Sequence, residues 1–106
     1  IISNHGGRQL DAVPPSIRRL PDVRSRVGDD YTLMVDSGVR SGLDIARAIT
    51  CGADFVLLGR AFMFGVAALG SKGGDHVVSV LKDELENTMV QLGIENLTGL
   101  RKVQRG

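Results

Sequence analysis

The chain has 106 residues, enough for one domain, and its 13 basic and 12 acidic residues give a formal net charge of +1. This balanced and interspersed charge argues against a nucleic acid or an anionic membrane surface as a partner. Cys51 is the only cysteine, which excludes a disulfide within the chain, and every apolar run is far shorter than the roughly 20 residues that span a bilayer.

Short apolar runs alternate with segments of helical periodicity in the first half of the chain. Ile1–Ile2 is the end of a first predicted strand, 33–35 is a second strand and 55–58 is a third. Because polar residues do not alternate within these runs, the runs are typical of parallel strands covered on both faces. The first predicted helix covers 14–27, and we expect Pro21, which has no backbone N–H, to break it.

The remaining predicted elements are helices. One covers 43–51, and an apolar one covers 61–69. A glycine-rich break at Gly70, Gly73 and Gly74 then precedes a long amphipathic helix that Asp75 is expected to cap. A last short turn is predicted over 96–100, and the basic tail after it is expected to fray. One stripe of the long helix is predicted to face the core: Val77, Val80, Leu81, Leu85, Thr88, Met89 and Leu92.

Several polar side chains support no functional prediction. His76 lies in the first turn of the long helix and is expected on its surface, and Cys51 is expected to pack in the interior. With two histidines and one cysteine, the sequence has no zinc-type ligand spacing, so no metal is expected. The arginines of the first helix are expected on its solvent side: Arg18, Arg19, Arg24 and Arg26.

The order of the elements is strand, helix, strand, helix, strand, helix, helix. This alternation predicts an α/β fold with a parallel sheet, either an open doubly wound sheet or part of an eightfold barrel. In both architectures ligands bind at the carboxyl ends of the strands. All three predicted strands end in unusual polar residues, so these three ends are the candidate functional site.

The residues after the first strand, Ser3-Asn4-His5-Gly6-Gly7-Arg8, are the most informative stretch of the chain. Histidine gains or loses a proton near neutral pH, so His5 is a candidate base. The planar fork of an arginine fits a carboxylate at two points, so Arg8 is a candidate ligand for an acidic substrate. The alternative is a structural histidine at the end of a strand.

Glycine stands close to arginine at the ends of the second and third strands, in Asp36-Ser37-Gly38-Val39-Arg40-Ser41-Gly42 and in Gly59-Arg60. Glycines let a backbone approach a ligand, and N–H groups at a helix start can hold an anion together with an arginine. This layout predicts a phosphate site, as in barrels where the last two loops and a short extra helix bind phosphate. Asp36 would instead accept hydrogen bonds from hydroxyl groups. The alternatives are a simple turn capped by Ser41 and a turn-capping role for Asp36.

Four segments occur here in the order typical of one family: Ser3–Asp11, Asp36–Gly42, Gly52–Asp54 and Leu57–Ala61. Together they resemble the FMN-dependent α-hydroxy-acid dehydrogenases and oxidases. L-lactate dehydrogenases, mandelate dehydrogenase and glycolate oxidase belong to this family. The resemblance runs from Ile1 to about Leu100, nearly the whole chain.

The resemblance implies a (β/α)₈ TIM barrel, of which this chain would supply the C-terminal portion, about three βα units. Its strands would be the sixth, entered late, the seventh and the eighth. Residues 1–106 would then be a C-terminal fragment of an FMN-binding barrel domain. A chain without an initiator Met that starts inside a strand fits that expectation.

The resemblance also implies roles for individual residues. His5 resembles the active-site base of the family, and Arg8 resembles its ligand for the substrate carboxylate. The residues that resemble the ribityl and phosphate site for FMN are Asp36, Ser37, Gly38, Arg40, Gly59 and Arg60. Each role agrees with what the residue types alone indicate about its loop.

The implied activity is the oxidation of an L-2-hydroxy acid, lactate-like, to the 2-oxo acid with FMN as electron acceptor. His5 would take the proton of the 2-hydroxyl group or, in a carbanion scheme, that of the α-carbon. One alternative is another FMN-dependent barrel enzyme such as an isomerase, which would not need the His5 and Arg8 pair. A further alternative is a catalytically inactive folding or interaction module.

The expected partners are a small 2-hydroxy acid and either further copies of the chain or the rest of the barrel. Nucleic acid is not expected, and a membrane-associating segment is not visible in this sequence. The expected location is the cytoplasm, with peripheral association on the inner face of the membrane as an open alternative. The 2-hydroxy acid and the final electron acceptor, which could be a quinone, a cytochrome or oxygen, are not specified by these residues.

Overall fold

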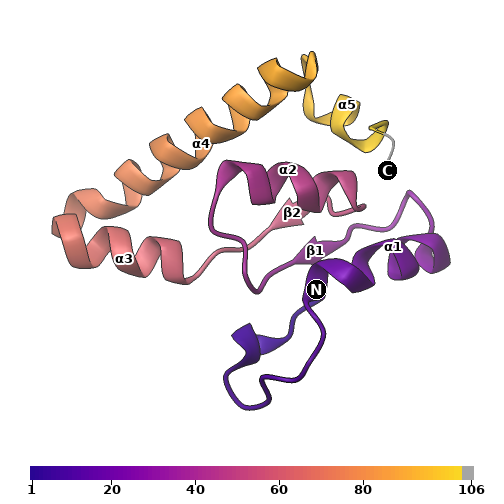
Figure 1. The fold of residues 1–106 in the computed structure, drawn as a ribbon, viewed down its shortest axis with the longest axis horizontal. Helices are drawn as coiled ribbons and strands as arrows, with labels where there is room; N and C mark the ends of the chain where they lie inside the picture. Colours follow the sequence, from indigo (N-terminus) through magenta and orange to yellow (C-terminus); the bar gives the residue numbers. More distant parts are fainter. Residues whose placement is uncertain (104–106) are drawn as a thin grey trace.

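A computed structural model describes residues 1–103 as a small α/β unit (Figure 1). Three parallel strand segments lie at its centre, and helices follow each of them. The two short 3₁₀ turns cover His5–Gly7 and Gly70–Lys72. The other elements are α1 (Ser16–Val27), β1 (Met34–Val35), α2 (Gly42–Thr50), β2 (Phe55–Val56), α3 (Arg60–Leu69), α4 (Gly73–Leu92) and α5 (Leu97–Arg101).

The strands are parallel, as the alternation of elements predicts. Met34 pairs with Phe55 and Val35 with Val56, and an isolated parallel bridge joins Ile2 to Val35. The regular strands have two residues each, shorter than the apolar runs suggest. Because parallel strands run in one direction, the loops that follow Ile2, β1 and β2 all leave from the same edge of the sheet.

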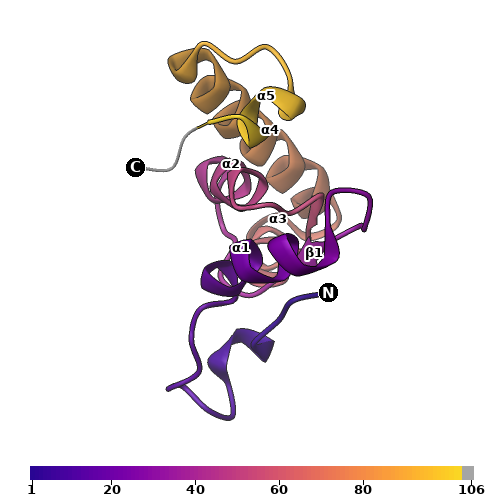
Figure 2. The ribbon, with the colours of Figure 1, turned by 90° about the vertical axis from the view of Figure 1, so that its right-hand side faces the viewer.

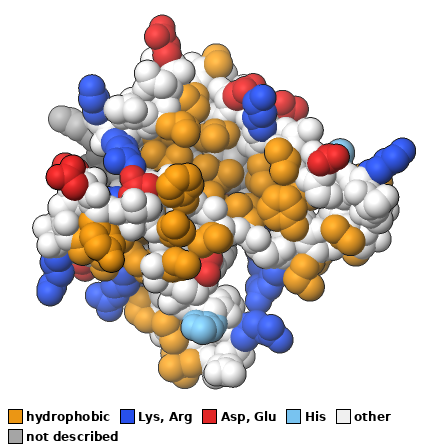
Figure 3. Space-filling model, turned by 180° about the vertical axis from the view of Figure 1, so that it is seen from behind, with side chains coloured by type: hydrophobic (Ala, Val, Ile, Leu, Met, Phe, Trp, Pro, Cys, Tyr) orange, Lys and Arg blue, Asp and Glu red, His pale blue; other side chains and the backbone are white. Residues whose placement is uncertain are grey.

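One face of the sheet is covered and the other is open. Val35 is buried with Leu33 and with Leu20 of α1 in a first core, which Ile2 and Val56 also contact. Since side chains alternate along a strand, Phe55 and Leu57 point the opposite way, and they are 60% and 42% exposed. Figure 3 shows apolar side chains gathered over the middle of the molecule seen from behind. The sheet therefore presents an uncovered apolar face.

α2 lies between the strands and α4 in both ribbon views (Figures 1 and 2). Its Ala46 and Ile49 form a second core with Leu100 of α5, and Leu85 and Met89 of α4 pack against it. The two helices approach closely at Gly42, where a Cβ would overlap the α4 backbone. The second core thus fixes the helical layer behind the sheet.

The predicted break at Pro21 is wrong, because α1 continues through this residue. A proline inside a helix removes one hydrogen bond and costs about 3 kcal/mol. Against this, Leu20 is completely buried, and Ile17 and Val23 pack on the same core. Burial of this stripe outweighs the missing bond.

The predicted start of the long helix is also wrong. α4 begins at Gly73, and no side chain of the described residues, Asp75 included, caps it. Gly73 lies inside the crossing of α3 and α4, because a Cβ there would overlap the backbone of Gly65. The predicted stripe holds for Leu81, Leu85 and Met89, whereas Val80 and Leu92 are exposed.

Arg24 corrects the expectation that the α1 arginines all face solvent, because its side chain is only 13% exposed. Its guanidinium donates to the carbonyl oxygens of Gly28, Tyr31 and Gly52 at 2.7–2.9 Å and to the Asp54 carboxylate at 2.6 Å. This arginine therefore closes the turn between α1 and β1.

Asp54 joins three elements at the amino ends of the strands. Its carboxylate accepts hydrogen bonds from Arg24, from the Leu33 N–H at 2.7 Å and from Arg101 of α5. Burial raises the pKa of Asp54, but the hydrogen bonds from Leu33, Arg101 and Arg24 outweigh burial and lower the pKa from 3.8 to about 2. The carboxylate is thus ionised and fully engaged at neutral pH.

Residues 1–103 contain neither a candidate membrane span nor a candidate metal site. No helix in this range is both long and apolar enough to cross a membrane. No group of three or more His, Cys, Asp or Glu side chains in the same range is placed to hold a metal ion. The expected fraying of the basic tail concerns, in part, residues 104–106, which lie outside the described residues.

Candidate active site

A cleft of about 350 Å³ lies at the carboxyl edge of the sheet. Three loops form it: the one after Ile2, the one between β1 and α2, and the one between β2 and α3. All eight residues predicted to form the site line this cleft: His5, Arg8, Asp36, Ser37, Gly38, Arg40, Gly59 and Arg60. Residues from distant parts of the sequence are thus brought together where the strand order predicts a ligand.

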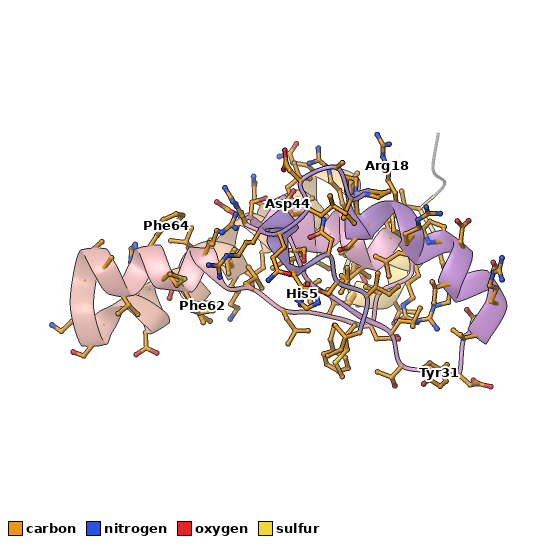
Figure 4. The ribbon with its side chains drawn as sticks, turned by 90° about the horizontal axis from the view of Figure 1, so that it is seen from below. His5, Arg18, Tyr31, Asp44, Phe62 and Phe64 are labelled. Atoms are coloured by element: carbon orange, nitrogen blue, oxygen red, sulfur yellow. The ribbon has the colours of Figure 1, made fainter. Side chains whose placement is uncertain are left out.

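His5 lies in the loop after Ile2, which projects away from the helices in Figure 1; His5 itself is labelled in the view from below (Figure 4). It has a left-handed φ of 56°, and the two glycines after it have φ values near 70°. The Asn4 side chain holds this turn, because its Oδ1 accepts from the Gly6 N–H at 2.9 Å. The exposed side chains of His5 and Arg8 also line a second hollow together with Gln9. The His5 imidazole and the Arg8 guanidinium therefore line the same hollow.

The loop after β1 contacts the His5 loop directly. The Ser37 Oγ accepts hydrogen bonds from the Asn4 and Gly6 N–H groups, both at 3.2 Å, and donates to the Asp36 Oδ1 at 2.5 Å. The Asp36 N–H in turn donates to the Ile2 carbonyl oxygen at 3.1 Å. Two of the three loops of the cleft are thus joined by hydrogen bonds.

The amino terminus of α2 is already filled by acceptors of the chain itself. The Ser41 Oγ caps it by accepting from the Asp44 N–H at 3.1 Å, as the alternative for this loop predicts. The Glu84 carboxylate of α4 accepts from the Gly42 N–H at 2.6 Å, and Asp44 accepts from the Arg40 N–H. Two carboxylates at this helix start disfavour a bound anion there.

The amino terminus of α3 is different. No side chain of residues 1–103 caps it, and Gly59 precedes it with no neighbouring atom within 4 Å of a Cβ built there. Arg60 forms its first turn, and one guanidinium nitrogen of Arg60 would lie 3.2 Å from a Cβ placed on Gly6. Free N–H groups and an arginine at a helix start form a favourable place for an anion.

The cleft fits a phosphate group linked to a polyol chain. Three arginines line it, Arg8, Arg40 and Arg60, so a dianion would meet excess positive charge. Gly38 has a φ of 92° and open space where a side chain would stand. Asp36 adds a carboxylate that accepts hydrogen bonds from hydroxyl groups. The donors and acceptors present therefore suit FMN, whose phosphate and ribityl chain carry both kinds of group.

Two features of the site were not predicted from the sequence. Asn4 and Ser37 tie the His5 turn together, and Glu84 closes the start of α2 from a distance of 42 residues along the chain. For the bonds at the His5 turn, the only signal in the sequence is the short polar residues that flank His5. Nothing in the local sequence around Glu84 indicates its bond to the start of α2, since this bond depends on how α4 packs.

The comparisons with known proteins identify the family of the chain. A family model described as FMN-dependent dehydrogenase matches residues 1–104. An L-lactate dehydrogenase of Caulobacter sp. (strain K31) is 46% identical over 97 residues, which are 92% of this chain and 26% of the relative.

Solved structures are similar over nearly the whole chain. A mandelate oxidase with benzoyl-formic acid has a TM-score of 0.91 and 37% identity, covering 97% of this chain and 31% of that one. A soluble mutant of the membrane-associated (S)-mandelate dehydrogenase from Pseudomonas putida has a TM-score of 0.87 and 41% identity. This match covers 93% of this chain and 28% of that one.

The chain spans about a quarter of the length of the curated relatives that it matches. The match with the family model nevertheless extends over almost every residue, and the expectation of FMN as cofactor is confirmed at the level of the family. The chain belongs to the FMN-dependent dehydrogenase family.

Proposed function

We propose that residues 1–106 are the C-terminal portion, about three βα units, of an FMN-binding (β/α)₈ barrel domain. The parallel alignment of Ile2, β1 and β2 supports this proposal, as does the helix that follows each of them. The uncovered apolar face of the sheet is further support, because the inner face of a barrel strand packs against the other strands.

The proposed activity is the oxidation of an L-2-hydroxy acid to the 2-oxo acid. One observation carries it: the cleft brings His5 and Arg8 together with the anion-accepting start of α3. The relatives named for lactate and mandelate support small 2-hydroxy acids as substrates. The isomerase alternative accounts for the phosphate loops but not for a base beside a carboxylate ligand.

In this proposal Arg40, Arg60 and the first N–H groups of α3 hold the phosphate of FMN, and Asp36 accepts hydrogen bonds from its ribityl hydroxyls. Gly38 and Gly59 leave the backbone open to the cofactor. FMN, when bound, supplies the two-electron acceptor, and the protein orients the reactants and stabilises charge.

Arg8 binds the substrate carboxylate through its guanidinium fork and so fixes the orientation of the 2-carbon. An imidazole nitrogen of His5 accepts the proton of the 2-hydroxyl group or, in the carbanion scheme, that of the α-carbon. The substrate loses two electrons and two protons overall: His5 takes one proton, and the electron pair and the second proton would pass to FMN.

We also propose that the complete protein works in the cytoplasm or as a peripheral protein on the inner face of the membrane. The membrane-associated (S)-mandelate dehydrogenase among the similar structures supports the second location. Association with the rest of the barrel, or with further copies, would cover the open face of the sheet.

The test is His5→Gln in the complete FMN-loaded enzyme, with flavin reduction by L-lactate and (S)-mandelate followed by stopped flow. Glutamine keeps hydrogen bonding but cannot act as the base, so we expect the rate constant to fall by about 10²–10⁴-fold. FMN should remain bound. His76→Gln is the matched control, because His76 is exposed on α4 and lies outside the cleft. Reduction of the His5 variant at the wild-type rate would remove His5 as the base.

A further inference from the structure

The side chain of Ser37 has no hydrogen-bonding capacity left for a ligand. A hydroxyl group has one donor and two acceptor positions. The donor is used on the Asp36 Oδ1 at 2.5 Å, and the acceptor positions are used by the N–H groups of Asn4 and Gly6 at 3.2 Å. Ser3 adds a fourth contact, with the two Oγ atoms 3.3 Å apart. All of these partners belong to the chain itself.

The backbone at this point is strained. Within residues 1–103, His5 and Ser37 are the two residues other than glycine with positive φ, at 56° and 75°. The backbone of a non-glycine residue is disfavoured in this region because its Cβ crowds a carbonyl oxygen, and it persists only where its surroundings hold it. The hydrogen bonds of the Ser37 hydroxyl connect these two strained positions. The strain and the network therefore occur at the same place.

We infer that Ser37 is a positioning residue: its hydroxyl fixes the His5 turn against the loop that carries Asp36. This inference rests on the proposed function, and it replaces the contact with FMN expected for the Ser37 side chain. Its Asn4 and Gly6 bonds hold the backbone on both sides of His5. Its bond to Asp36 orients the carboxylate that lines the same cleft. One hydroxyl group thus sets the relative placement of the base and of an acceptor for the cofactor.

Two substitutions separate the hydroxyl group from the backbone conformation. Ser37→Ala removes the hydroxyl and keeps the strained φ, whereas Ser37→Gly removes the hydroxyl and relieves the strain. In the complete FMN-loaded enzyme we expect both to lower the rate constant of flavin reduction at saturating L-lactate by about tenfold to a hundredfold, the effect of a small misplacement. The dissociation constant of FMN should rise far less than the rate constant falls, because Arg40, Arg60 and the first N–H groups of α3 hold the phosphate without Ser37.

Ser41→Ala is the matched control. Ser41 is four residues along the same loop and caps α2, so Ser41→Ala should lower the melting temperature by a few degrees without changing the placement of His5. A wild-type rate constant in this control, together with lowered rate constants in both Ser37 variants, supports the inference that Ser37 positions the His5 turn. A wild-type rate in Ser37→Gly would overturn the inference, and so would parallel losses of FMN and activity in both Ser37 variants.

Hydrogen exchange distinguishes a failure of this inference from a failure of the proposed function. The amides of Asn4 and Gly6 should exchange faster in Ser37→Ala than in the wild type, whatever substrate the enzyme uses. If the wild type is not reduced by 2-hydroxy acids, the proposed function fails, and faster exchange would still support the structural part. Unchanged exchange rates at both amides would overturn the inference that Ser37 positions the His5 turn.

Discussion

Three arginines line the cleft, and each offers a different means of holding an anion. Arg8 follows the His5 turn and is exposed at the second hollow, where a substrate can reach it. Arg40 precedes the start of α2, where the carboxylates of Asp44 and Glu84 already accept backbone hydrogen bonds. Arg60 belongs to the uncapped start of α3. Charge alone would make them equivalent, whereas their surroundings predict a role for Arg8 that differs from the shared role of Arg40 and Arg60.

For Arg8 we predict that Arg8→Lys impairs turnover of 2-hydroxy acids far more than it impairs retention of FMN. Lysine keeps the charge but loses the two-point contact, which is worth about 1–3 kcal/mol for a charge-assisted pair. Steady-state kinetics and flavin titration measure the two effects. Arg18→Lys is the control, since Arg18 lies on α1 well away from His5 (Figure 4). Equal loss of flavin and activity would instead assign Arg8 to the cofactor.

For Arg60 the prediction is the reverse. Arg60→Ala should raise the dissociation constant of FMN by about tenfold to a hundredfold, because one charge-assisted contact is lost at an otherwise uncapped helix start. Added FMN should restore part of the activity, and Arg40→Ala should behave similarly. Arg47→Ala is the control, because Arg47 is exposed on α2 and pairs with Asp44. Unchanged flavin affinity in Arg60→Ala would make this arginine structural.

The residue types of the site could be predicted from the sequence, but their hydrogen bonds could not. The chemistry of His5 and of the arginines lies in their side chains and can be read from the residue types. Their positions after parallel strands were enough to predict that they lie close together. The part played by Ser37 depends on a left-handed backbone and on a loop 31 residues away. Arg24 was misjudged for the same reason, because its partners lie in turns that only the fold brings close.

Among the elements, α5 is tied to the strand ends by Asp54 and to α2 by Leu100. The Asp54 carboxylate links α5 to the end of α1 and to the residue before β1, and its side chain is 19% exposed. Since its pKa lies below the ordinary value, the carboxylate stabilises the fold above pH 3.8, and this stabilisation is lost as the pH falls toward about 2.

We therefore predict that Asp54→Asn lowers the free energy of unfolding at neutral pH by about 1–2 kcal/mol, allowing for partial exposure. The difference from wild type should shrink as the pH falls from 3.8 toward about 2. Urea unfolding at a series of pH values measures this. Asp22→Asn, which alters an exposed ion pair with Arg19, should change little. A pH-independent difference would show that the charge of Asp54 is not responsible.

Helices were predicted more accurately than their ends and interruptions. Apolar periodicity located α1, α2 and α4, because the residues that such a helix buries recur at helical spacing in its own sequence. The error at Pro21 arose because tertiary burial of Leu20 overrides a local preference. The error at Asp75 arose because Gly73 serves the contact with α3 instead of a break. Both depend on neighbours that are distant in the sequence.

At the scale of the whole molecule, the two faces of the sheet differ in how far they are covered. Helices cover one face of the sheet, and the other exposes Phe55 and Leu57. Each regular strand has only two residues, and in residues 1–103 β2 pairs on one side only. Unpaired strand edges and an exposed apolar face favour association with further strands.

Residues 1–106 expressed alone should therefore self-associate, show no oxidation of 2-hydroxy acids and bind FMN only weakly. Size-exclusion chromatography with light scattering and flavin titration would measure this. Phe55→Lys, which places a charge on the open face, should reduce the self-association. A monomer that binds FMN with about micromolar affinity or better would contradict the prediction.

The position of α5 has a practical consequence. The Asp54 contact holds α5 at the amino ends of the strands, whereas the cleft lies at their carboxyl ends. Lys102, the exposed residue that follows α5, is thus on the far side of the sheet from His5. A resin or electrode linked through the Lys102 amine would hold the protein with its cleft turned toward the solution. Immobilisation at this site would leave the path to the cleft unobstructed by the support.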